Sequence, residues 1–450
     1  MFLIHDDGYA RLGWDLRHQS GGTVHLASFT FHSGVGTTRS LTSSRRFASA
    51  EERDSALASF VEGKLSMGYR KLPNAGFSGA MQGPQVRPRP RLYNKTEKRL
   101  LGDAEDERTW QEHADEVRTE EPALSEIPLA LRIAMEPYHH THGYGEARTL
   151  APLLQGEWRH GFILRASLSI ESRLNDSVQD VEMLRALAGW EGAKFLRSLT
   201  VGRVVHGGWS GDQSFQRILD ALVFYAPCFP LRELSIVGSS RCVDRDGGYS
   251  DNDGSSWTRC PQNIGQLLSA FTDLRALSVD ATIIQMARLR HETLDSLRIR
   301  CGVFSDDNAQ ALASAKLPRL TRLELSFCHR EGFVDGEARQ VRTILEGHAF
   351  PKLEYLAIQN TRHLNEVAEV IVASALLPSL SHLDMSGGGL DDQGGKLLLQ
   401  QEEALRHLTT LDLRRNHLGP DLVDTLQHAF GDAVMLEEQT APLPEPEFDD

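Results

Sequence analysis

Apolar residues recur along the second half of the chain in a short pattern, L-x-x-L-x-L, with polar residues between them. The most complete copy is Leu408-x-x-Leu411-x-Leu413-x-x-Asn416-x-Leu418. Alternation of this kind predicts a strand with one buried face, and its recurrence predicts a repeat array. Near-copies begin earlier in the chain, at Leu196, Leu231, Leu274, Leu294, Leu320, Leu353 and Leu380.

Helical patterns fill the returns between these strands. The spacing from one strand to the next varies from about 20 to about 43 residues, so the strand is the constant part and the return is the variable part. A helix on each return makes the sheet curve, because helices are wider than strands. Helices are predicted over residues 215–225, 264–271, 283–289, 308–315, 337–346, 365–375, 394–405 and 421–430.

The residue after each strand adds a second feature to the pattern. Asn416 follows Leu413, and Cys328 holds the same place after Leu325. With these residues the array over 161–435 resembles the leucine-rich repeats of ribonuclease-inhibitor-like proteins. The resemblance implies an α/β leucine-rich repeat solenoid with parallel strands on the concave face, helices on the convex face and a structural role for Cys328. We expect the Asn416 side chain to satisfy backbone groups where the chain leaves the strand.

The first 73 residues have a different pattern. Strands are predicted at 14–17 and 23–31, followed by a Gly-rich link, a short basic strand and an amphipathic helix that Ser49 caps. In order, and above all from Phe47 to Tyr69, this region resembles a WGR domain, a small α+β module. WGR domains of poly(ADP-ribose) polymerases contact DNA partly through a Trp-Gly-Arg that this chain lacks, so a module for packing or protein contact is the alternative. Candidate nucleic-acid contacts are Arg39, Arg45, Arg46, Arg70 and Lys71.

Three further segments complete the predicted organisation. Residues 74–95 are rich in Gly and Pro and are predicted to be a flexible linker. Residues 96–160 are predicted to be mostly helical, and Trp110-Gln-Glu-His-Ala114-Asp115 resembles the repeat-companion segment of multidomain bacterial proteins, which implies a cap on the array. Residues 436–450 are predicted to be a disordered acidic tail.

Composition excludes several classes of function. The net charge is −14, although residues 1–100 are basic and the remainder is acidic. The five cysteines have no CxxC spacing, which argues against a zinc cluster or a disulfide framework. No apolar run is long enough for a membrane helix, and acids at Asp6 and Asp7 interrupt any leader-like start, so we expect a cytoplasmic protein.

Metal and cofactor sites are not predicted. His139, His140 and His142 lie together but have no matching cluster elsewhere, so exposure is the expected state. The polar insertion at 237–263 carries four aspartates, followed by Trp257 as its large apolar residue, but their spacing does not fit a calcium loop, and a mobile acidic loop is expected. The chain contains no P-loop, G-x-S-x-G or H-E-x-x-H motif. Ser381 and His382 are sequence neighbours, and strand alternation predicts that they point to opposite faces.

Function is therefore expected on the concave face, where the residues between the leucines point. The leading hypothesis is a non-enzymatic scaffold that binds a protein partner there, and ordinary solvent exposure of polar positions is the alternative. The second hypothesis is a regulator that contacts DNA or RNA through the basic N-terminal module. The predicted partner-binding residues are Arg298, Arg300, Arg322, Glu324, Tyr355, Gln359, His382, Asp384, Asp412, Arg414 and, in the insertion, Trp257.

Overall fold

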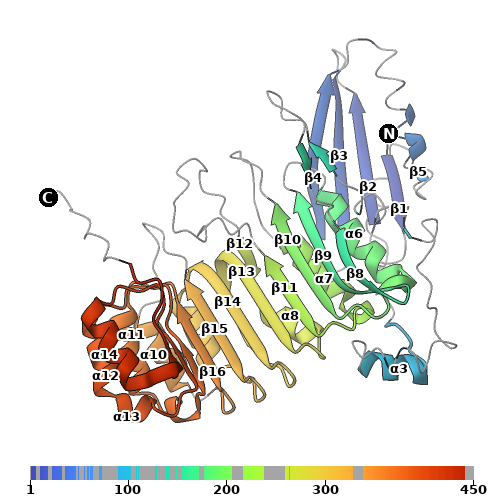
Figure 1. Cartoon of the computed structure of the whole chain (residues 1–450). Helices are drawn as coiled ribbons and strands as arrows, with labels where there is room; N and C mark the ends of the chain where they lie inside the picture. Colours follow the sequence, from blue (N-terminus) through green and yellow to red (C-terminus); the bar gives the residue numbers. More distant parts are fainter. Residues whose placement is uncertain are drawn as a thin grey trace.

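A long sheet that curves through most of the chain dominates the computed structural model (Figure 1). The sheet has 12 strands, and two smaller sheets of five and two strands stand before it in the sequence. The structure describes residues 154–171, 177–204, 216–237, 259–262, 264–327, 338–347 and 349–440. Before these it describes 2–6, 11–18, 23–32, 36–46, 70–72, 90–102, 138–140 and 148–150, with single residues between 49 and 63 and between 108 and 135.

The strands of the large sheet confirm the predicted array. Each copy of the leucine pattern supplies one strand, and neighbouring strands pair in parallel and in order, with β9 before the first copy. From β13 onward the strands shorten toward the C-terminus, from 10 residues to two. They are β9 (Phe162–Glu171), β10 (Ser198–Val204), β11 (Glu233–Val237), β13 (Ala276–Gln285), β14 (Ser296–Val303), β15 (Arg322–Phe327), β16 (Tyr355–Gln359), β17 (His382–Asp384), β18 (Thr410–Asp412) and β19 (Val434–Met435).

The register of these strands stacks the leucines into rows. One row runs through the central leucine of each repeat, and none of its members is more than 1% exposed: Leu199, Leu234, Leu277, Leu297, Leu323, Leu356, Leu383 and Leu411. The row forms a continuous core along the sheet. Burying one leucine side chain contributes about 1.5–3 kcal/mol to stability.

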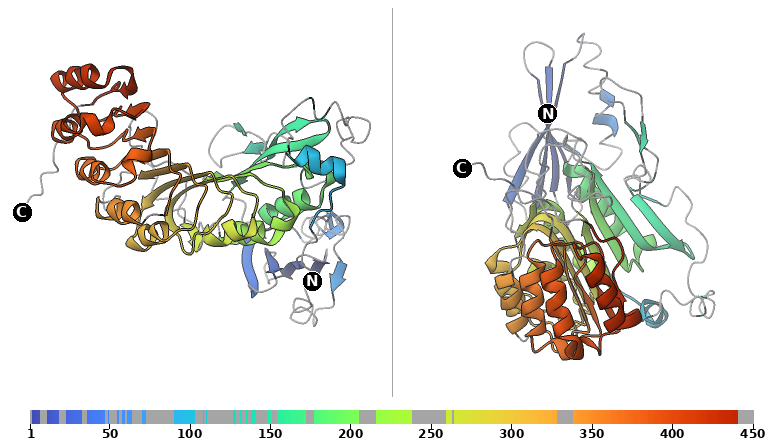
Figure 2. Two further views of the ribbon diagram at one scale, coloured as in Figure 1. Left: turned by 90° about the horizontal axis from the view of Figure 1, so that it is seen from below. Right: turned by 60° about the vertical axis from the view of Figure 1, so that its left-hand side comes forward.

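Helices cover one face of the sheet, as predicted, and leave the other face open (Figure 2). The prediction of a helix at 283–289 is wrong. β13 continues to Gln285, and residues 286–289 are not helical. The return from there to Ser296 is the shortest in the array and has no room for a helix. The helices of the returns are α6 (Ser177–Gly189), α7 (Gln216–Tyr225), α8 (Ile264–Ala270), α9 (Asp306–Ala313), α10 (Ala338–Glu346), α11 (Leu364–Val372), α12 (Asp392–Gln400), α13 (Glu402–Leu405) and α14 (Pro420–Phe430).

Asn416 performs the predicted role at the exit of β18. Its Nδ2 donates to the carbonyl oxygens of Met385 at 2.9 Å and Leu413 at 3.0 Å, and its Oδ1 accepts from the amides of Gly388 at 3.0 Å and Leu390 at 3.4 Å. The side chain is 0% exposed. One amide thus joins two successive repeats. Cys328 lies outside the described residues.

The array ends later than predicted. Gln439 occupies the place in the last, partial repeat that Asn416 occupies in the repeat before it. Its Nε2 donates to the carbonyl oxygens of Leu413 and Leu436, both at 2.9 Å, and its Oε1 accepts from the amide of Leu418 at 3.2 Å. Residues 436–440 therefore belong to the array and not to a disordered tail, and residues 441–450 lie outside the described part.

The start of the array departs from the helical prediction for 96–160. α3 (Lys95–Gly102) is a helix, but β8 (Leu154–Arg159) is a strand that pairs antiparallel with β9. β8 pairs with backbone groups of β9 that would otherwise be exposed at the start of the array, and this pairing outweighs a weak helical pattern. Trp110, which is 1% exposed, packs against Phe162 and Phe195 and covers the apolar residues beside the first strand. A hairpin of β6 (Tyr138–His140) and β7 (Arg148–Leu150) lies within the same segment.

The last residues of the predicted linker are anchored. Arg91 donates through Nη2 to the carbonyl oxygens of Leu187, Ala188 and Trp190, at the C-terminal end of α6, at 3.0, 2.8 and 2.8 Å. Burial lowers the pKa of this guanidinium. The Tyr93 hydroxyl donates to the carbonyl oxygen of Lys194 at 3.0 Å. Residues 90–95 are thus part of the folded unit, because cationic donors satisfy the free carbonyls of a helix end.

The N-terminal residues form an antiparallel sheet in the order β4-β3-β2-β1-β5. The predicted strands β2 and β3 and the basic strand β4 are present, and β1 and β5 were not predicted. The strands are β1 (Phe2–Asp6), β2 (Arg11–His18), β3 (Thr23–His32), β4 (Gly36–Arg46) and β5 (Arg70–Leu72). No helix in the described part of the chain is both long and apolar enough to cross a membrane.

Candidate functional site on the concave sheet

The polar positions between the leucines come together in three rows across the open face of the sheet. Because each strand pairs in register with the next, residues at equal places in successive repeats are direct neighbours. The first row holds Arg322, Tyr355 and His382, the second holds Arg298, Glu324, Asp384 and Asp412, and the third holds Arg300 and Gln359, with Arg414 just beyond β18.

Three arginines of β14 and β15 form the basic part of this face. Arg298 Nε lies 3.3 Å from Glu324, and Arg322 Nε pairs with the same carboxylate. Arg300 lies 3.9 Å from Asp280, at the limit of an ion pair. The side chains of Arg298 and Arg322 are 53% and 44% exposed, whereas that of Glu324 is 13% exposed. The guanidinium groups therefore form the surface and the carboxylate lies below them.

Arg322 continues into an aromatic stack. Its Cζ lies 3.5 Å from the centroid of the Tyr355 ring, a cation–π contact. The Tyr355 ring in turn lies 5.9 Å from the His382 ring, with 30° between their planes. Burial, and then the nearby Asp384 carboxylate, raise the pKa of Tyr355 to about 12. The phenol is therefore uncharged and serves as a fixed platform for the arginine.

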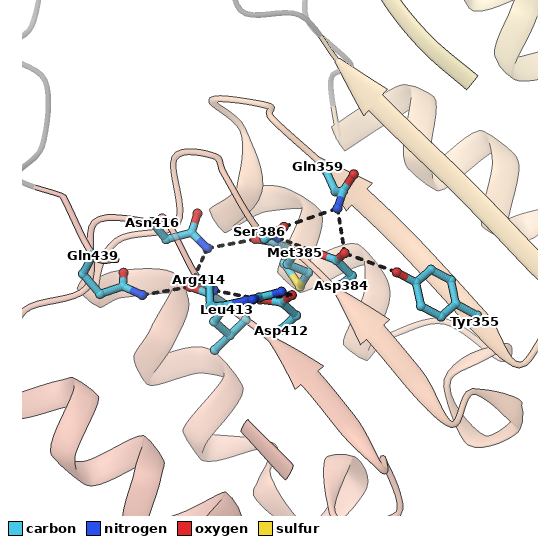
Figure 3. A network of polar contacts seen from close by, with 10 residues as sticks. All are labelled: Tyr355, Gln359, Asp384, Met385, Ser386, Asp412, Leu413, Arg414, Asn416 and Gln439. Atoms are coloured by element: carbon cyan, nitrogen blue, oxygen red, sulfur yellow. Dashed lines mark hydrogen bonds and ion pairs between the residues drawn. The ribbon is translucent and has the colours of Figure 1, made fainter. Parts of the chain in front are cut away.

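Asp384 fixes Tyr355 from below. Its Oδ2 accepts from Gln359 Nε2 at 2.6 Å and from the Tyr355 hydroxyl at 3.3 Å, and its Oδ1 accepts from the Ser386 amide at 3.0 Å (Figure 3). The residue is 7% exposed. Its buried carboxylate thus orients the side chains of Tyr355 and Gln359 and adds no exposed charge to the face.

Asp412, on the next strand, has a similar internal role. Arg414 donates to its two oxygens, with the shortest contact at 2.6 Å from Nη2 to Oδ2 (Figure 3). This hydrogen bond is the main cause that raises the pKa of Arg414. Asp412 is 5% exposed. The C-terminal end of the face is acidic in sequence, but both of its aspartates are buried and hydrogen-bonded.

The second row carries small side chains in the N-terminal half of the face, which the sequence analysis missed, whereas the first row there holds the exposed pair Arg165 and Glu233. In the second row, β9 to β13 contribute only hydroxyl residues: Ser167, Thr200, Ser235 and Ser278. These residues stand at the same place in the repeat as Arg298, so comparing equal positions across repeats would have found them. The short side chains leave a shallow surface beside the arginines of β14, and we call the part of it formed by Ser235 and Ser278 the floor.

The remaining predicted contacts lie in other parts of the chain. Trp257 lies outside the described residues. Arg39, Arg45 and Arg46 are on β4, and Arg70 and Lys71 are on β5, at opposite edges of the five-stranded sheet. With a strand spacing of about 4.8 Å, the two edge strands are about 19 Å apart. The fold therefore divides the proposed nucleic-acid residues into two groups.

The predicted separation of Ser381 from His382 is wrong. Ser381 Oγ lies 2.8 Å from His382 Nδ1. Alternation does not apply here, because β17 begins at His382 and Ser381 precedes it. Ser381 Oγ also lies 3.2 Å from the Glu354 carbonyl oxygen. Among the described residues, no carboxylate bonds to His382 to orient it as a catalytic base, and none of them form a group of three or more possible metal ligands.

Comparison with known proteins agrees with this geometry. A family model described as leucine-rich repeat matches residues 377–399 and 404–421. The fold is thus a leucine-rich repeat solenoid, and no catalytic family is indicated. A crystal structure of a Bacteroides fragilis protein from a structural genomics consortium is 17% identical, covering 98% of this chain and 97% of that one, with a TM-score of 0.48. A likeness at that level indicates no shared activity or partner. No curated protein matches the chain.

Proposed function

We propose that this chain is a non-enzymatic scaffold whose concave sheet binds a protein partner. Leucine-rich repeats generally mediate contacts between proteins, and the match covers the last repeats. The main support is the stack of Arg322 on Tyr355, which presents a rigid, partly exposed pair on an open sheet. Arginine and tyrosine are the residue types that most often dominate binding energy at protein interfaces.

The other components of the proposal follow from the same arrangement. The WGR-like module at 1–73 and the cap at 96–160 supply further surfaces for contact, and the scaffold acts in the cytoplasm. The buried aspartates Asp384 and Asp412 and the amide of Gln359 support the surface from within, while Arg298, Arg322 and His382 provide its outer groups.

Site-specific photo-cross-linking tests the proposal. A benzoylphenylalanine in place of Ser296, between Ala276 and Arg322 on the open face, is expected to capture a protein from the native lysate. The matched control replaces Glu369, an exposed residue of α11 in the helical layer. Equal capture at both positions, or none at Ser296, would contradict binding on the concave sheet.

Contact of the N-terminal module with DNA or RNA is the second candidate. It rests on the basic character of residues 1–100. A salt titration of binding to short DNA measures it, because release of counterions gives a steep slope. Binding that is missing at low salt would exclude this function.

A further inference from the structure

The charges on the concave face do not balance at its basic end. Arg298 and Arg322 share the single carboxylate of Glu324, while Arg300 has Asp280. Counting only residues that the structure describes, three cations thus stand against two anions, and the anions are the less exposed members: 13% for Glu324 and 19% for Asp280. We call the guanidinium groups of Arg298, Arg300 and Arg322 the arginine strip; their side chains are 53%, 25% and 44% exposed. It presents net positive charge on a chain whose formal charge is −14.

Arg322 is the best-ordered member of the strip. Its guanidinium plane is held on the ring of Tyr355, and Tyr355 is held through Asp384. Within the described part of the chain, Glu324 is its only acidic partner, and the contact uses Nε. No other described residue is hydrogen-bonded to Nη1 or Nη2 of Arg322, so these donors can serve a ligand. Two parallel N–H groups match the two oxygens of a carboxylate, and their prior ordering reduces the entropy lost on binding.

The surroundings favour a chain-like ligand. The strip borders the floor of Ser235 and Ser278, whose short side chains leave the guanidinium of Arg298 open from that side. An extended segment lying on this floor has its side chains within reach of Arg298 and Arg322. The cluster of Tyr355 and His382 closes the other side.

We propose that the arginine strip binds an acidic segment of a protein partner through its carboxylate side chains. This inference rests on the proposed function of the concave sheet and names the chemistry of the partner. Nucleic acid fits the strip poorly, because a duplex brings one charge per about 1.7 Å, while the strip offers an excess of one cation on an acidic protein. A short run of glutamates or aspartates matches the excess charge and the fork of Arg322.

Fluorescence anisotropy with the full chain tests the inference. The probe is fluorescein-labelled oligo-glutamate, and oligo-glutamine of the same length is the control probe. Oligo-glutamate is expected to bind and oligo-glutamine is not, and added salt should weaken the binding because the pairs are exposed. Arg322→Gln is expected to weaken binding at least about tenfold, the factor that about 1.4 kcal/mol represents.

Matched variants distinguish the effect of charge on probe binding from the effects of side-chain geometry and of folding. Arg322→Lys keeps the charge but loses the planar fork, so its loss should lie between wild type and Arg322→Gln. Arg298→Gln removes the second open guanidinium and should also weaken binding. Arg406→Gln is the control, because Arg406 is 70% exposed and pairs with Glu402 at 2.7 Å beside α13 in the helical layer. It should bind the probe as wild type does.

Several outcomes would overturn the inference. These are failure of oligo-glutamate to bind wild type, unchanged binding by both Arg322→Gln and Arg298→Gln, and complete competition by single-stranded DNA at equal concentration. If cross-linking at Ser296 still captures a protein in those cases, the scaffold function stands and only the acidic partner is rejected. If the peptide binds but no protein is captured, the strip is an anion site without a protein partner, and both proposals fail.

Discussion

Replacing Asn416 by alanine should destabilise the C-terminal repeats strongly. The substitution leaves two buried carbonyl oxygens, of Met385 and Leu413, the buried amide of Leu390 and the partly buried amide of Gly388 without their partner. A buried polar group that loses its hydrogen bond costs about 1–3 kcal/mol, and the longest of the four bonds is weak. The expected loss is therefore about 3–5 kcal/mol of local stability.

Gln439 offers an internal comparison, because it makes the same type of bonds in the partial last repeat. It is half-buried, so water replaces the bonds that Gln439→Ala removes. The expected loss is about 1 kcal/mol. Thr425→Ala is the neutral control, since Thr425 is exposed on α14 and its hydroxyl bonds only to the Asp421 carbonyl of the same helix.

Hydrogen exchange with mass spectrometry measures these effects where they occur, because repeat arrays open locally. Amides over 383–418 should exchange at least about 100-fold faster in Asn416→Ala, since each 1.4 kcal/mol is tenfold. Gln439→Ala should accelerate them by about fivefold. Equal effects of the two variants, or unchanged exchange in Asn416→Ala, would refute the conclusion that this amide joins successive repeats.

Three other predictions concern single groups. Arg91→Ala should expose residues 90–102 to proteolysis and lower stability by about 2–3 kcal/mol, because three carbonyls at the C-terminal end of α6 and just beyond it lose a charged donor; unchanged cleavage would argue against anchoring. Cys301 should resist iodoacetamide until the protein unfolds, because it is 1% exposed and burial raises the pKa of its thiol; labelling of the native protein would contradict this. The pKa of Tyr355 is raised to about 12, so its stabilising effect should be complete below pH ~10 and disappear as the pH rises from ~10 to about 12. The difference in urea midpoint between wild type and Tyr355→Phe should shrink over that range.

The sequence predicted the array well because its core depends on a local period. Leu297 and its equivalents are spaced within single strands, and parallel pairing then follows from repetition. The failed helix at 283–289 shows the limit of that approach. An apolar run of this length suits a strand or a helix, and the length of the return, not the period, decided for the strand.

The chemistry of the face was less predictable. Alternation correctly placed Asp384 and Asp412 between leucines, but it does not show that the strands are so closely paired there that both carboxylates become buried. The contact of Ser381 with His382 depends on where β17 begins, which a leucine pattern does not define. Local pattern fixes side-chain direction within a strand, whereas burial and partnership depend on the neighbouring strands.

The two ends of the large sheet limit how this molecule can associate with itself. At one end β19 is only two residues long, and the loop that follows it folds back through Gln439 onto the preceding repeat. At the other end β8 runs against the direction of the array and carries the charged residues Glu157 and Arg159. Short and charged edges are poor templates for the addition of another strand. The large sheets of separate copies should therefore not join end to end into fibres at high concentration.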